Sequence, residues 1–206
     1  MQNPLELVVT VWLAVWPAAG VVLPPVLLPA RSHAASSVAG SDRETPAALL
    51  ALSDEDLAAR IESDPATIGP LSIGSAGSAV LFNAVALPED PRWRVAPGSE
   101  SWTTTETIAA IEAAVATVGE LFADTPPITI GDISALAGGR LKRHESHQAG
   151  RDVDFGFYYK PGRGAWFTPG TAANLDLPRN WAFVRALLAR TDVERVFLDT
   201  RIQRLL

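Results

Sequence analysis

One short segment gathers the residue types that could carry out hydrolytic metal chemistry. In residues 143–155, RHESHQAGRDVDF, two imidazoles stand three positions apart, and Asp154 follows His147 by seven. Imidazole nitrogen and carboxylate oxygen both bind zinc at about 2 Å, and a catalytic zinc site keeps a position open for water. The segment therefore indicates a metal centre built from histidine and aspartate.

The elements around this segment must bring its side chains to one point. Gly150 permits a turn, and residues 152–159 alternate strictly between two faces, as a strand does. Such a turn can fold the histidines back over the strand. Because Asp152 shares the polar face with Asp154, the spacing alone does not select the ligand. It also allows histidines on a polar loop beside solvated aspartates.

Composition limits both the ligands and the partners. The chain has 206 residues, no cysteine, three histidines and a formal net charge of −6. Any metal must therefore be held by His, Asp or Glu, and no disulfide framework exists. An acidic chain lacks the basic face that nucleic acid requires, so we expect no nucleic-acid partner. The high hydrophobic content excludes a disordered chain.

The first 39 residues are predicted to be a signal peptide or an uncleaved leader. Residues 5–28 are almost uncharged, and Ser37-Val38-Ala39 fits the small-x-small pattern of a cleavage site. Several prolines argue against a continuous membrane helix, although no Lys or Arg precedes the apolar stretch. These features predict an exported protein, periplasmic or in the cell envelope.

Beyond the leader, helices and strands alternate. Residues 40–68 are predicted to form a short helical lead-in, and 69–206 the main domain. The order indicates an α+β domain with helices on a mostly antiparallel sheet. The expected helices are 53–62, 103–122 and 180–190, with one more opening at Asp199; the expected strands are 80–87, 92–95, 128–133, 152–159 and 194–198.

The central motif resembles a known family. The run from Ser146 to Asp154, SHQAGRDVD, is similar to the signature of penicillin-insensitive murein endopeptidases. These belong to a wider group of zinc peptidases with D-Ala-D-Ala peptidases, lysostaphin-type endopeptidases and the hedgehog domain. Other similar segments extend the resemblance over residues 69–206: Ser72–Ser75, Ile130–Ser134, Gly138-Gly139 and Val193–Phe197.

The resemblance implies roles for individual residues. His147 and Asp154 would be the first two zinc ligands. His144 would line the site as a further ligand or a catalytic group. Asp152, Gln148 and Ser146 would support the ligands and the loop. The substrate would be the peptide cross-links of peptidoglycan, and no stable protein partner is implied.

One departure from the family pattern concerns the metal site. The family carries a later His-x-His pair, yet no histidine follows His147 here. An apolar stripe also starts at Ile202 and is cut after about two turns. We therefore expect a chain truncated at its C-terminus and inefficient as a peptidase in this form. The alternatives are a DD- or LD-carboxypeptidase on the same scaffold, or a non-catalytic wall-binding or structural domain.

Overall fold

The computed structural model describes residues 9–13, 48–49, 51–75, 77–141 and 144–206. The chain divides into two compact units, one of residues 1–14 and 70–206 and the other of residues 15–69. Among the described residues, no helix combines the length and the apolar character that crossing a membrane requires.

The larger unit contains a five-stranded sheet with the order β5-β7-β8-β1-β9. Only the edge pair of β5 and β7 is parallel; the other neighbours are antiparallel. This arrangement confirms the predicted α+β class with a mostly antiparallel sheet. The strands are β1 Val9–Leu13, β5 Trp93–Val95, β7 Ile128–Ile130, β8 Asp152–Phe155 and β9 Val193–Phe197.

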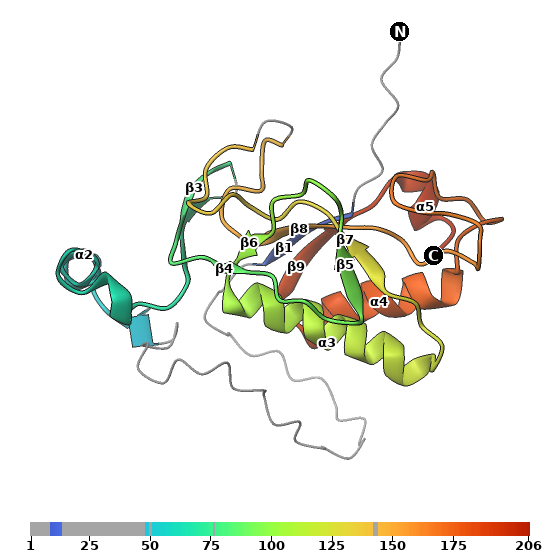
Figure 1. Cartoon of the computed structure of the whole chain (residues 1–206), viewed down its shortest axis with the longest axis horizontal. Helices are drawn as coiled ribbons and strands as arrows, with labels where there is room; N and C mark the ends of the chain where they lie inside the picture. The colour runs from blue at the N-terminus through green and yellow to red at the C-terminus, as the bar shows by residue number, and fades with distance from the viewer. Residues whose placement is uncertain (1–8, 14–47, 50, 76, 142–143) are drawn as a thin grey trace, which may run out of the picture. The chain divides into compact units, whose positions relative to one another are not determined.

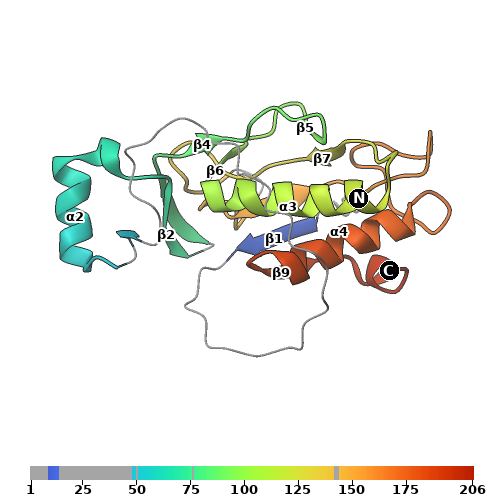
Figure 2. The ribbon, with the colours of Figure 1, turned by 90° about the horizontal axis from the view of Figure 1, so that it is seen from below.

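Two helices, α3 (Thr105–Leu121) and α4 (Leu177–Arg190), pack against each other on one side of the sheet (Figures 1 and 2). Helix α3, expected over residues 103–122, buries Ile111, Val115 and Val118 on one side. These side chains share one core with residues of β7, β8 and α4. The helices thus cover one face of the sheet, and polar side chains can occupy the opposite face.

Strand β8 contributes side chains to both faces of the sheet. Val153 and Phe155 join the core, and the Phe155 ring contacts Phe183 of α4 edge-on at 4.9 Å. Because side chains alternate along a strand, Asp152 and Asp154 project to the face away from the helices. The predicted alternation is confirmed over Asp152–Phe155, where β8 ends. It was wrong beyond that point, because Tyr158, expected on the face of Asp154, lies in the core.

Several predicted boundaries were wrong for identifiable reasons. Helix α4 begins at Leu177 instead of Asn180, because Asp176 caps it and a proline is tolerated in a first helical turn. The expected strand 80–87 is interrupted at Asn83, whose φ of 48° turns the chain. It forms β3 (Ser78–Phe82) and β4 (Val85–Ala86), which pair with β2 (Leu71–Ser75) and β6 (Trp102–Thr103) respectively.

The shorter helices agree with their capping signals. In the smaller unit, α2 (Asp54–Ser63) begins after Ser53, whose hydroxyl accepts a hydrogen bond from the Asp56 N–H. A short 3₁₀ turn, Pro65–Thr67, follows it. In the larger unit, Asp199 caps α5 (Thr200–Gln203) as predicted. Capping by a Ser or Asp oxygen satisfies backbone N–H groups that a helix start leaves without partners.

Strand β1 falls within the predicted leader. It lies between β8 and β9, and position 10 pairs with Asp154. The rest of residues 1–39 lies outside the described residues, so removal of a leader stays a prediction. The finding means that residues 9–13 supply hydrogen-bond partners to two strands of the sheet.

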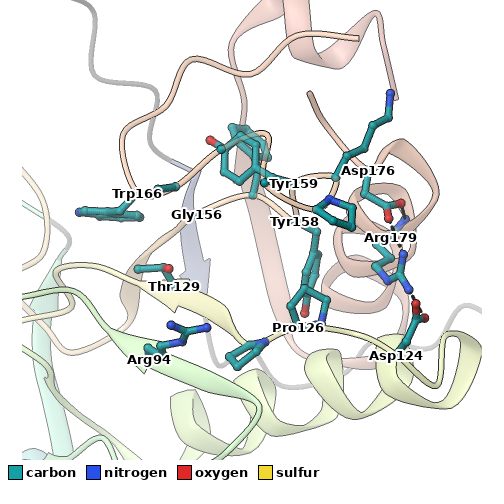
Figure 3. Close-up of a pocket in the computed structure, with 17 residues that line it drawn as sticks. Arg94, Asp124, Pro126, Thr129, Gly156, Tyr158, Tyr159, Trp166, Asp176 and Arg179 are labelled. Atoms are coloured by element: carbon teal, nitrogen blue, oxygen red, sulfur yellow. Dashed lines mark hydrogen bonds and ion pairs between the residues drawn. The ribbon is translucent and has the colours of Figure 1, made fainter. Parts of the chain in front are cut away.

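A pocket of about 410 Å³ opens at the β5–β7 edge of the sheet (Figure 3). Trp166 borders it at one end and Arg179 at the other, and Arg94 reaches it from β5.

Core packing against the sheet predicts the effect of truncating a buried helix residue. Ile111 is 1% exposed. The Ile111→Ala substitution should therefore lower the free energy of unfolding of the protein by about 2–5 kcal/mol, because it leaves a cavity among the neighbouring side chains. Leu121→Ala is the control on the same helix, since that residue is 63% exposed, and it should change stability little. Chemical denaturation of both variants measures the difference, and equal losses would contradict the assigned core.

The position of β1 predicts the effect of removing the N-terminal segment. A chain of residues 40–206 should unfold at a temperature lower by roughly 5 °C or more, because β8 and β9 lose their shared partner. A chain starting at Val9 keeps β1 and is the control. Thermal unfolding followed by circular dichroism tests this. An unchanged unfolding temperature of the 40–206 chain would show that β1 does not stabilise the fold, and it would favour the prediction that residues 1–39 are a leader.

Candidate metal centre

A tight turn brings the loop before β8 back over that strand. His147 has φ +62° and Gly150 has φ +70°, so both adopt the left-handed conformation, which is unfavourable for a residue with a side chain. The backbone N–H of His147 donates to Asp152 Oδ2 at 2.8 Å. This hydrogen bond offsets the strain and holds the histidine above the strand.

The His147 side chain is oriented for metal binding. It is 1% exposed, and its Nδ1 lies 3.2 Å from the carbonyl oxygen of Ile133. Because a carbonyl only accepts, Nδ1 carries the proton and Nε2 keeps its lone pair. Nε2 lies 3.1 Å from Asp154 Oδ1 but makes no hydrogen bond of acceptable geometry with a described residue. The two atoms are close enough to bind one ion together.

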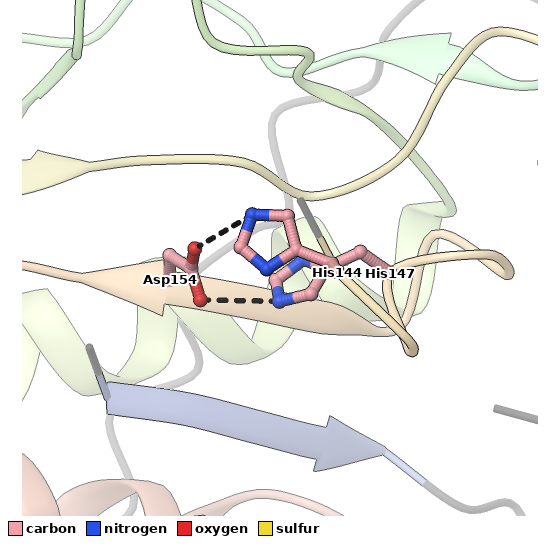
Figure 4. Close-up of side chains that lie close together, drawn as sticks. All are labelled: His144, His147 and Asp154. Carbon is pink, nitrogen blue, oxygen red and sulfur yellow. Dashed lines mark ion pairs between the residues drawn. The ribbon is translucent and has the colours of Figure 1, made fainter. Parts of the chain in front are cut away.

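His144 completes the group. Its Nε2 lies 3.7 Å from Asp154 Oδ2, and its ring centroid lies 4.3 Å from that of His147 (Figure 4). The same nitrogen lies 3.1 Å from Asp132 Oδ2. The structure thus brings together the three residues that the resemblance implied as ligands.

The donor set fits a zinc-sized ion. His144, His147 and Asp154 each offer a ligand atom, and these atoms all lie within 4.8 Å of one another. Two ligand atoms at about 2 Å from a tetrahedral ion are about 3.3 Å apart, close to the 3.1 Å between His147 and Asp154. A cation would also neutralise the carboxylates buried here, whose desolvation is otherwise costly.

Asp132 lies in the site but was not among the site residues predicted from the sequence. It is 8% exposed and follows β7; Oδ1 accepts from the Glu100 N–H at 2.9 Å, while Oδ2 faces His144. Its backbone carbonyl accepts from the Asp154 N–H at 3.0 Å. Asp132 therefore links His144 to the strand of Asp154. Its place just after a strand, inside the Ile130–Ser134 segment, was the available signal.

The other predicted supporting residues lie around the turn. Gln148 donates to the carbonyls of Gly77 and Glu145 at 3.0 and 2.9 Å, which connects this loop with the β2–β3 hairpin. Burial raises the pKa of Asp152, while the His147 N–H and the Ser146 side chain act in the opposite direction. Asp152 and Gln148 thus shape the loop, and Ser146 adjoins the Asp152 carboxylate.

Opposing effects act on the pKa of His147. Burial, the largest single effect, lowers it, but the Asp154 carboxylate, 3.1 Å from Nε2, and the charge of Asp152 together outweigh burial and raise the pKa above its usual value. A proton and a metal ion therefore compete for the same nitrogen.

A buried group of two histidines and an aspartate that could hold a metal ion thus lies on the face of the sheet opposite the helices. Residues 72–168 match the family of penicillin-insensitive murein endopeptidases, which confirms the resemblance seen in the sequence. The matched segment is slightly less than half of the chain and contains all three candidate ligands and Asp132; Val193–Phe197 lies beyond it. No curated protein matches the chain.

The raised pKa of His147 predicts a pH dependence of zinc binding. Below that pKa, His147 is protonated, so zinc must displace a proton and its apparent affinity should fall about tenfold per pH unit. Above the pKa, the zinc affinity should no longer change with the protonation of His147. Competition titration with a chromogenic chelator from pH 5 to 8 measures this. His144→Gln should keep the dependence, and a flat profile in the unaltered protein would contradict it.

Proposed function

We propose that this protein is a zinc-dependent endopeptidase that hydrolyses the peptide cross-links of peptidoglycan in the cell envelope. The observation that carries the proposal is the convergence of His144, His147 and Asp154 within the segment that matches the murein endopeptidase family. Bound zinc would supply a water molecule of lowered pKa and would polarise the scissile carbonyl.

His147 and Asp154 are proposed as the primary ligands. The Ile133 carbonyl fixes the imidazole tautomer that leaves Nε2 unprotonated. Asp154 is held from the β7 side, because its N–H donates to Asp132 and its carbonyl accepts from the Gly131 N–H at 2.7 Å. Both ligands are therefore positioned by backbone groups of the segment after β7, which favours a preformed site.

His144 is proposed as the proton-handling group. Its Nε2 faces the Asp132 carboxylate, which accepts a hydrogen bond and orients the ring. At 16% side-chain exposure it is more accessible than His147, as a group that exchanges protons with substrate must be. A role as third ligand is the alternative, and it predicts a different response to substitution.

The test combines zinc titration with cleavage of cross-linked muropeptides. His147→Ala and Asp154→Asn should each weaken zinc binding by about tenfold to a hundredfold or more and abolish zinc-dependent cleavage. Glu145→Gln removes a charge from the same loop at an exposed side chain and should behave as the unaltered protein. Removal of the metal with a chelator should stop cleavage reversibly.

The His144→Ala variant separates the two roles. A proton-handling group predicts nearly unchanged zinc affinity with turnover lowered about a hundredfold, whereas a ligand predicts loss of both. Product analysis distinguishes release of monomers, expected of an endopeptidase, from release of a terminal amino acid, expected of a carboxypeptidase. Cleavage is expected to be slow, because no histidine follows His147 to supply the His-x-His pair of the family. Tight zinc binding without even slow cleavage would contradict the proposed activity and favour a structural or wall-binding domain.

A further inference from the structure

The pocket at the β5–β7 edge adjoins the candidate metal centre along one face of the sheet. Arg94 of β5 pairs with Thr129 of β7, and the Gly156 N–H donates to the Thr129 carbonyl at 2.8 Å. Paired residues of neighbouring strands share a face, and so do residues two apart in one strand. Arg94, Thr129 and Gly156 therefore form a row across the face that carries Asp154.

Trp166 lines the pocket and lies over the sheet face close to Asp154. A methyl group added at Gly131 would lie 2.7 Å from the Trp166 ring and 3.0 Å from Asp154 Cβ; one added at Gly156 would lie 3.3 Å from the same ring. The indole thus covers two glycines on adjacent segments, one side next to Asp154 and the other lining the pocket.

The pocket has an excess of positive charge. Its lining includes three cations and two carboxylates. Arg179 is committed to ion pairs with both carboxylates, Asp124 and Asp176, and Lys160 Nζ donates to two backbone carbonyls. No described residue pairs with Arg94, so its guanidinium is available to a ligand. Prolines and aromatic rings form apolar walls around it (Figure 3).

We propose that this pocket binds a carboxylate-bearing residue of the murein peptide and that Arg94 receives the carboxylate. The inference rests on the proposed function, because it uses the metal centre to place the cleaved bond. Strand spacing places Arg94 and Asp154 on the order of 10 Å apart, the length of about three extended residues. The recognised carboxylate therefore lies a few residues from the cleaved bond, and Arg94 is a specificity-determining residue, not a catalytic one.

Titration calorimetry of the full chain without metal tests the proposal independently of cleavage. The probes are one cross-linked muropeptide with free carboxylates and the same compound with its carboxylates converted to amides. The unaltered protein should bind the free acid about tenfold or more tightly than the amide, since charge-assisted hydrogen bonds are lost with the charge. In Arg94→Gln this preference should fall to within about twofold.

Arg185→Gln, at an exposed arginine of α4, is the matched control and should keep the full preference. Circular dichroism verifies that each variant is folded. Equal preference in the unaltered protein and Arg94→Gln, or no binding of either probe, overturns the pocket assignment. If the preference depends on Arg94 while zinc-loaded protein cleaves neither compound, the pocket assignment stands and the endopeptidase proposal fails.

Discussion

The hydrogen bond from the His147 N–H to the Asp152 carboxylate is the constraint on which the candidate site depends. A histidine in the left-handed conformation costs on the order of 1–3 kcal/mol and persists only when its surroundings fix it. At 2.8 Å, the buried Asp152 supplies that fixation from the strand that also carries Asp154. The turn and the ligand strand therefore position each other. Without this contact, nothing in the local sequence would keep His147 above Asp154.

The sheet explains why polar groups can be buried at this point. The helices take the Val153 and Phe155 side of β8, so the opposite side is free for carboxylates. Asp132 and Asp154 are connected through their backbones as well as through His144. Buried carboxylates need hydrogen-bond donors or cations. Here backbone N–H groups and imidazoles serve this purpose, which leaves an arrangement that a divalent cation would stabilise further.

Sequence reasoning located the candidate ligands and the residues that support their loop, but it missed Asp132. His144, His147 and Asp154 were found because their types and spacing carry the chemistry, and the alternation of 152–155 placed the aspartates on one face. Asp132 was not identified, because it meets His144 across twelve positions of chain and no local period encodes such a contact. The start of α4 was misplaced because a proline can either precede a helix or occupy its first turn. The Trp166 contact depends on two distant glycines, and their role appears only after folding.

Strand β1 shows that the sequence pattern alone cannot always assign a segment to one kind of structure. Residues 8–13, Val-Val-Thr-Val-Trp-Leu, are apolar and rich in β-branched side chains, which suits both the apolar region of a signal peptide and an interior strand. Composition cannot separate these possibilities, and the backbone pairing shows what the segment contributes when it forms a strand. In the structure, β8 has β7 on one side and β1 on the other, and β1 pairs with all four residues from Asp152 to Phe155. A buried strand leaves few backbone groups unpaired. The strand that carries Asp152 and Asp154 thus has a backbone partner at this position, and residues 9–13 supply it beside the candidate metal centre.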